Sequence, residues 1–174
     1  MPLKLRLFSA IITPTVLYGM ASAPLTNTLV HRINVTERRM IRLIIGWVRV
    51  DRSGWPGTMR RMRARIDRVL ERFPLQRWTQ QIFKRQWELS HRWANMDNED
   101  WTTQAVLWDP TTTYNSEHEP TRRQGRPLRK WDDKLNRFCL EEFGVHRWTI
   151  GARRMSKDAW LQHQRRYCEY CEAH

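Results

Sequence analysis

The sequence has little of what a disulfide-bonded or membrane-spanning protein needs. It contains 3 cysteines in 174 residues, an odd number, and Cys168 and Cys171 lie too close together to cross-link a long loop. A reducing compartment fits this composition, so we expect an intracellular protein, cytoplasmic and/or nuclear. No segment reaches the roughly 20 apolar residues of a membrane-spanning helix, so no membrane partner is predicted.

The sequence also lacks the short motifs of common enzyme classes. It has no Gly-rich phosphate loop, no nucleophile elbow and no His-Glu-x-x-His helix. A hydrolase interpretation could start from the carboxylates of Asp132, Asp133, Glu141 and Glu142. We interpret these instead as charges at helix starts and on the surface.

A zinc site is the one metal-binding alternative. Cys168, Cys171 and His174 have suitable donor atoms, and Cys139 or His163 could supply a fourth ligand. Three of these ligands lie within seven residues at the chain terminus, where ordinary helix residues explain them better. We therefore predict no metal and no other cofactor.

Positive charge is what the sequence has in excess. It holds 31 Lys and Arg against 18 Asp and Glu, a net charge of +13, and all but five of the basic residues are arginines. The planar guanidinium suits phosphate oxygens and stacks on bases. The composition favours a polyanionic partner, most often nucleic acid; a genome rich in Arg codons is the alternative.

Residues 1–46 predict two apolar helices. The first runs from Leu3 to about Ala21 around Pro14, and we interpret it as buried rather than as a signal peptide because Pro24 would follow the cleavage site. A turn at residues 23–28 caps the second helix, and Gly46 ends it. The apolar face of the second helix comprises Leu29, Val30, Ile33, Met40, Ile41, Ile44 and Ile45.

Residues 47–57 predict a turn-rich linker, and residues 58–108 a basic helical region. Thr58 is expected to cap a helix with an apolar face of Met59, Met62, Ile66, Val69 and Phe73. Steps of four, three and four residues place a second set of side chains on the opposite face, namely Arg61, Arg65, Arg68 and Arg72. This arginine stripe is a candidate phosphate-binding surface, with a merely solvated face as the alternative. A further helix is expected from Leu75 and a short one from Asn98 to Trp108.

Residues 109–127 predict a long exposed loop, and residues 128–174 a C-terminal helical region. One helix there is expected from Leu128 to Phe143, with Leu128, Trp131, Leu135 and Phe138 on its apolar face and Gly144 at its end. The last helix is expected to start near Ser156 and to place Trp160, His163 and Tyr167 on one face. Since no segment alternates as a strand would, the sequence predicts an all-α, multi-helix fold.

The 10 tryptophans divide into two groups. The apolar seams of the predicted helices contain Trp78, Trp87, Trp93, Trp131 and Trp160, which we expect in the core. Helix ends and loops contain Trp47, Trp55, Trp108 and Trp148, which are the candidates for stacking on nucleobases.

The most distinctive run is Arg-Arg-Gln-Gly-Arg-Pro-Leu-Arg-Lys-Trp-Asp-Asp, residues 122–133. It resembles the C-terminal part of reverse transcriptases of non-LTR retrotransposons, which commonly read Arg-Gly-Arg-Pro, a basic residue, Trp and an acidic pair. Three further blocks follow the same family order: residues 4–19 with Leu-Tyr-Gly, residues 37–46 with Arg-Arg-Met, and residues 152–154 with Trp160. The resemblance implies that residues 1–46 are thumb-like helices and that a small helical C-terminal region follows.

The same resemblance implies a parent RNA-directed DNA polymerase, and if Met1 is not the true start, the palm domain of a longer polyprotein is a partner of this chain. The family's aromatic-Ala-Asp-Asp turn is missing, and Asp132 and Asp133 lie at a predicted helix start, so we expect no polymerase activity from this chain alone. RNA or DNA backbone is the expected partner, through Arg61, Arg65, Arg68, Arg72, Arg122, Arg123, Arg126, Arg129 and Lys130. A decayed fragment or a helical protein-interaction module is the alternative.

Overall fold

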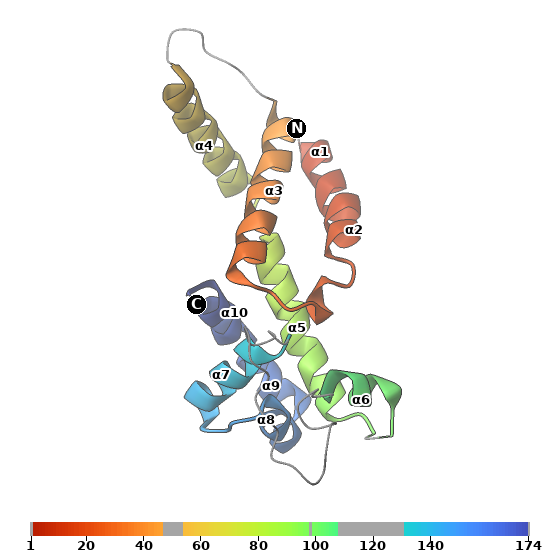
Figure 1. Ribbon diagram of the computed structural model, residues 1–174. Coiled ribbons are helices and arrows are strands. Elements are labelled where there is room, and N and C mark those ends of the chain that lie inside the picture. The colour runs from red at the N-terminus through yellow and green to blue at the C-terminus, as the bar shows by residue number, and fades with distance from the viewer. Residues whose placement is uncertain (1, 47–53, 98, 108–130, 174) are drawn as a thin grey trace, which may run out of the picture. The chain divides into compact units, whose positions relative to one another are not determined.

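The computed structural model describes residues 2–97 except 47–53, residues 99–107 and residues 131–173 (Figure 1). These residues form helices joined by turns, and no strand occurs among them, which confirms the all-α, multi-helix prediction. The chain divides into two compact units, residues 1–83 (the N-terminal unit) and residues 84–174 (the C-terminal unit). The boundary lies inside helix α5, Trp78–Ala94, so each unit contains one part of that helix.

The N-terminal unit begins with three consecutive helical segments: α1 (Pro2–Leu7), the π-helical turn η1 (Phe8–Ile12) and α2 (Thr13–Leu17). Pro14 lies in the first turn of α2 and has no N–H to donate, and the wider π turn directly precedes it. Tyr18 leaves the helix, Gly19 turns the chain with a φ of 70°, and the 3-10 turn η2 (Met20–Ser22) follows. The helix therefore ends four residues before the predicted Ala21.

Only one face of this first helix is covered. Leu5, Phe8, Thr13 and Leu17 are buried. Exposed apolar side chains line the rest of it, namely Leu3, Leu7, Ile11, Ile12, Val16 and Tyr18. The prediction of a fully buried helix is wrong for the described chain, because one layer of helices covers one face only.

Helix α3 (Asn27–Ile45) lies between α1–α2 and α4 (Figure 1). Thr26 caps it by accepting a hydrogen bond from the Leu29 N–H at 3.2 Å, and Gly46 ends it with a φ of 85° that favours glycine. Ile33, Ile41 and Ile45 are buried. The remaining positions of the predicted apolar face are half-buried, namely Leu29, Val30, Met40 and Ile44. Both ends and the face of this helix are confirmed.

Helix α4 (Gly54–Arg72) starts four residues earlier than predicted. Thr58 is not its cap but is buried within it, and its hydroxyl donates to the Gly54 carbonyl at 3.1 Å. Pro56 is compatible with the first turn, where backbone N–H groups have no partner within the helix. Met62 and Ile66 are buried, as their spacing predicts.

Helix α5 starts at Trp78 rather than at Leu75. The reason is a contact far away in the sequence: the buried Glu37 carboxylate of α3 accepts the Trp78 backbone N–H at 3.0 Å. The Trp78 indole also donates to the Thr13 hydroxyl at 2.9 Å and its ring stacks on Phe8. Trp78 thus links α5 to α3 and to the first helical segment of the N-terminal unit, and the bond from Glu37 fixes where its own helix begins.

The C-terminal unit contains the rest of α5 and five shorter helices: α6 (Trp101–Leu107), α7 (Asp133–Phe143), α8 (Trp148–Arg154), α9 (Lys157–Gln162) and α10 (Gln164–Ala173). Helix α7 starts later than the predicted helix from Leu128 and ends at Gly144 as expected. Ser156 caps α9 by accepting the Ala159 N–H at 3.2 Å. Helix α8 was not predicted, and the expected last helix is divided into α9 and α10.

The core of the C-terminal unit is built around two parallel indoles. The rings of Trp87 and Trp160 stack 4.0 Å apart at an angle of 2°. Each indole N–H donates to the other residue's backbone carbonyl, at 2.8 Å and 3.1 Å. The buried Tyr167 hydroxyl donates to Gln86, whose amide in turn donates to the Trp131 carbonyl. Trp78, Trp87 and Trp160 are core residues as predicted, whereas Trp93 and Trp131 are half-buried.

Candidate nucleic-acid interface

The arginine stripe lies on α4, beside the face that holds its buried residues and about 110° round the helix from Met62 and Ile66. Arg61, Arg68 and Arg72 are exposed and Arg65 is half-buried. At about 100° per residue, the four side chains centre on one line of the helix, well away from the line of Met62 and Ile66. The stripe therefore faces solvent over about three turns and can run beside a phosphate backbone.

Positive charge is concentrated in the N-terminal unit. Residues 1–83 contain 15 Lys and Arg against 4 Asp and Glu, whereas residues 84–174 contain 16 against 14. Eleven of the 13 net positive charges thus belong to the N-terminal unit. One of its four acids, Glu37, is buried, and burial, its largest influence, raises the pKa of this carboxyl.

The arginines of the two units also differ in their partners. In the C-terminal unit, Arg165 pairs with Glu169 at 2.9 Å and Arg166 pairs with Glu142. In the described part of the N-terminal unit, no arginine forms an ion pair with another described residue. Positive charge therefore exceeds negative charge in this unit without short-range ion pairs among its described residues, although Arg38 and Arg77 lie near enough to Glu37 to lower its pKa.

The C-terminal end of the stripe meets a second element. Arg72 and Arg6 of α1 both line a hollow of about 280 Å³, together with Phe73 and Leu75. The Arg72 guanidinium lies 5.7 Å from the centre of the Phe73 ring, within cation–π range. Arg6 and Arg72 thus place two cations at one hollow, although 65 residues separate them in the sequence.

A groove of about 390 Å³ separates α3 from α4. Its apolar lining consists of Val35, Met59, Met62 and Ile66. Its polar and charged lining consists of His31, Arg38, Arg42, Arg63 and Asp67. Sequence reasoning missed these groove arginines because they come from two helices that only packing brings together. The i, i+4 spacing of Arg38 and Arg42 is the one local signal that could have indicated them.

No protein-family model, no curated protein and no solved structure matches this chain.

The other predicted contact residues lie elsewhere. Five of them are outside the described residues, namely Arg122, Arg123, Arg126, Arg129 and Lys130. Of the stacking candidates, Trp47 and Trp108 are also outside the described residues, and Trp55 is 64% exposed. Trp148 was predicted wrongly: it is 2% exposed and its indole donates to Asp132 at 3.0 Å. It begins a helix that was not predicted, and the packing of that helix against α7 buries it.

Asp132, the first residue of the acidic pair at the start of α7, is held by two side-chain hydrogen bonds. Asp132 Oδ2 accepts hydrogen bonds from the Trp148 indole and from the Asn136 side chain, at 3.0 Å and 3.2 Å. The bond from Trp148 joins the start of α7 to α8, whereas the bond from Asn136 lies within the first turn of α7. Among the described residues no group of three or more His, Cys, Asp or Glu side chains is placed to hold a metal ion.

The cysteines lie in or beside the core of the C-terminal unit. Burial raises the pKa of Cys139 and of Cys171 to about 12 and that of the half-buried Cys168 to about 11. Their thiols are therefore protonated at neutral pH, the form that neither attacks nor ligates. His174, the remaining member of the predicted zinc set, is outside the described residues.

None of the described helices is long and apolar enough to cross a membrane.

Proposed function

We propose that this chain binds RNA or DNA through the phosphate backbone, with the arginines of α4 as the main contacts. We propose further that it is the C-terminal, nucleic-acid-binding region of a non-LTR retrotransposon RNA-directed DNA polymerase, without the catalytic palm. The four sequence blocks in family order support this origin. The observation that carries the binding proposal is the concentration of arginines in the N-terminal unit, where no described arginine forms an ion pair with another described residue.

The physical argument rests on counterion release. Each phosphate that an arginine neutralises releases condensed cations from the nucleic acid, so affinity falls steeply with salt. Contacts of this kind hold the backbone and read little sequence. The stripe supplies at most four such contacts, namely Arg61, Arg65, Arg68 and Arg72, and Arg6 extends it beside Arg72.

The test is a salt titration of affinity by fluorescence anisotropy, on the full chain with short duplex and single-stranded oligonucleotides. The variant is Arg61→Gln/Arg68→Gln/Arg72→Gln, which removes three exposed cations of the stripe. We expect the slope of log K against log salt to become shallower by about 2 to 3, since each duplex phosphate contact contributes about 0.9.

A matched control removes the same charge from the other unit. Arg85→Gln/Arg92→Gln/Arg154→Gln also deletes three exposed arginines, but from the unit in which cations and acids nearly balance. We expect its slope to stay close to that of the unmodified chain. Equal effects of the two triple variants would reduce the binding to net charge alone, and no measurable binding at low salt would refute the proposed function.

A second candidate, a helical protein-interaction module, is favoured by the exposed apolar side chains of α1–α2. Leu3 is 68% exposed, Ile11 57% and Leu7 49%, and contiguous apolar patches of this kind mark interaction surfaces. Analytical ultracentrifugation of the full chain with and without Leu7→Glu/Ile11→Glu tests it. Self-association that the double variant abolishes supports this function, and a monomer at every concentration argues against a homotypic one.

A further inference from the structure

We propose that the groove between α3 and α4 holds an unstacked nucleobase of a single-stranded nucleic acid, while the arginines at its rim hold the flanking phosphates. This inference rests on the proposed function and adds a preferred substrate to it. The groove belongs entirely to the N-terminal unit and is distinct from the arginine stripe. The arginine that α4 contributes to the groove is Arg63. Around the helix, Arg63 lies on one side of the buried residues Met62 and Ile66, and the stripe lies on the other side.

The lining of the groove has the two chemistries that a nucleotide presents. Its apolar part contains Met59 and Met62, and methionine sulfur makes favourable contacts with aromatic rings. Its rim contains Arg38, Arg42 and Arg63 against one acid, Asp67. A flat aromatic base can rest on the apolar part while its phosphates meet guanidinium groups.

The size of the groove sets the size of the ligand. At about 390 Å³, it lies near the lower end of the roughly 300–1,000 Å³ of small-molecule pockets. This volume suits a single nucleotide and is far too small for a duplex. A paired base would have to leave its stack first, at a cost of a few kcal/mol. Single strands therefore have access to the groove that a duplex lacks.

Charge favours a nucleic acid over an acidic peptide as the occupant. The groove lies in the unit that carries eleven of the 13 net positive charges. Polyanions with a charge at every residue gain most from such a field. Arginine guanidinium planes also stack on bases, which adds a contact that a carboxylate side chain cannot make.

The direct test uses the methionine methyl groups of the full chain as reporters. With ¹³C-methyl methionine, the protein is titrated with oligodeoxythymidylate of about 12 residues and with an abasic oligomer of the same phosphate number. We expect the oligodeoxythymidylate alone to shift the Met59 and Met62 resonances, because the ring current of a base stacked on a methyl group changes the magnetic field that the methyl group experiences. Met20, outside the groove in the same unit, is the internal reference. We also expect the abasic oligomer to bind about fivefold more weakly, or worse.

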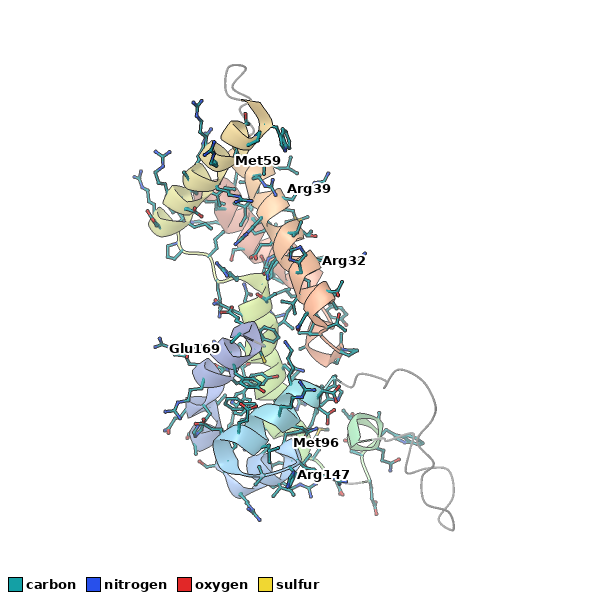
Figure 2. All side chains as sticks on the ribbon, turned by 60° about the vertical axis from the view of Figure 1, so that its left-hand side comes forward. Arg32, Arg39, Met59, Met96, Arg147 and Glu169 are labelled. Atoms are coloured by element: carbon teal, nitrogen blue, oxygen red, sulfur yellow. The ribbon has the colours of Figure 1, made fainter. Side chains whose placement is uncertain are left out.

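Two double variants with equal charge separate groove contacts from net charge. Arg38→Gln/Arg42→Gln removes two rim cations, whereas Arg32→Gln/Arg39→Gln removes two exposed arginines of the same helix that do not line the groove (Figure 2). We expect the ratio of the affinity for oligodeoxythymidylate to the affinity for the abasic oligomer to fall toward one in the first variant. We expect the same ratio to be unchanged in the second variant. Circular dichroism checks that both remain helical.

The outcomes distinguish the groove from the proposed function. If both oligomers bind equally and neither shifts Met59 or Met62, the groove proposal is overturned while backbone binding stands. If neither oligomer binds at low salt, the proposed function fails as well. If oligoglutamate shifts the two methionines and the oligodeoxythymidylate does not, the groove is a peptide site and the proposal is wrong.

Discussion

Replacing Glu37 tests a buried, charged packing contact of the N-terminal unit. The side chain is 5% exposed, and its Oε1 accepts the first backbone N–H of α5, at Trp78, from 3.0 Å. Burial raises the pKa of this carboxyl, while the Trp78 N–H, Arg77 and Arg38 act in the opposite direction. Glu37 therefore provides a helix cap at the cost of a desolvated charge.

The two substitutions at this position separate those effects. In Glu37→Ala the Trp78 N–H loses its acceptor in a buried setting, which costs about 1–3 kcal/mol of unfolding free energy, comparable to the loss of an N-cap. In Glu37→Gln an amide oxygen can still accept the N–H and no charge is desolvated. We expect that variant to lie within about 1 kcal/mol of the unmodified chain at pH 7.

The pH dependence has a definite sign. Because the folded-state pKa is raised above the ordinary 4.5, the folded chain binds the proton more tightly than the unfolded one. The stability that Glu37 contributes is therefore fully present below about pH 4.5 and is lost as the pH rises through the folded-state pKa. Relative to Glu37→Gln, the unmodified chain should gain stability as the pH falls from 7 toward 4.5.

Urea unfolding at several pH values, followed by circular dichroism and tryptophan fluorescence, measures both effects. Each transition is fitted separately if the two units unfold apart. Equal destabilisation by the Ala and Gln variants would refute the capping role. If the unmodified chain instead loses stability relative to Glu37→Gln as the pH falls from 7 toward 4.5, the desolvation argument is refuted.

Three further predictions concern the C-terminal unit. Trp87→Phe leaves the Trp160 carbonyl without its indole donor and reduces the ring area stacked on Trp160. We therefore expect the unfolding free energy measured in urea to fall by about 2 kcal/mol, and a change below about 0.5 kcal/mol would contradict this. Gly144→Ala places a Cβ at a φ of +66° with nothing within 4 Å, so backbone strain alone should cost about 1–2 kcal/mol in the same assay. Cys139 and Cys171, with pKa values of about 12, should resist iodoacetamide at pH 8 until the chain is unfolded; mass spectrometry that finds either one modified rapidly in the native chain would show that the site opens.

Local sequence signals predicted the features that depend on neighbouring residues. Thr26 and Ser156 cap helices, and Gly46 and Gly144 end them, because the hydrogen bonds and backbone angles involved span only a few residues. The helical spacing of α4 likewise predicted its buried side, with Met62 and Ile66, and the alignment of the four arginines of the stripe, which lie beside that face rather than opposite it.

The candidate interface was predictable only in part. The stripe follows from the period of one helix, so the sequence sufficed to place Arg61, Arg65, Arg68 and Arg72 on one side. The groove forms only when α3 packs against α4. Arg6 and Arg72 line one hollow only because α1 packs beside the end of α4 and the residues that follow it. The spacing of residues within one helix does not indicate which other segment that helix packs against.

By itself, the sequence determined the helical class, the helix ends with local caps and the total charge of +13. Only the tertiary structure decided that α5 begins at Trp78, because its cap is a carboxylate 41 residues away. Only tertiary packing buried Trp148 against Asp132 and brought Arg6 and Arg72 to one hollow. The physical reason is range: capping and periodicity act within a few residues, whereas burial and the summed field of charges depend on segments that meet only when the chain folds.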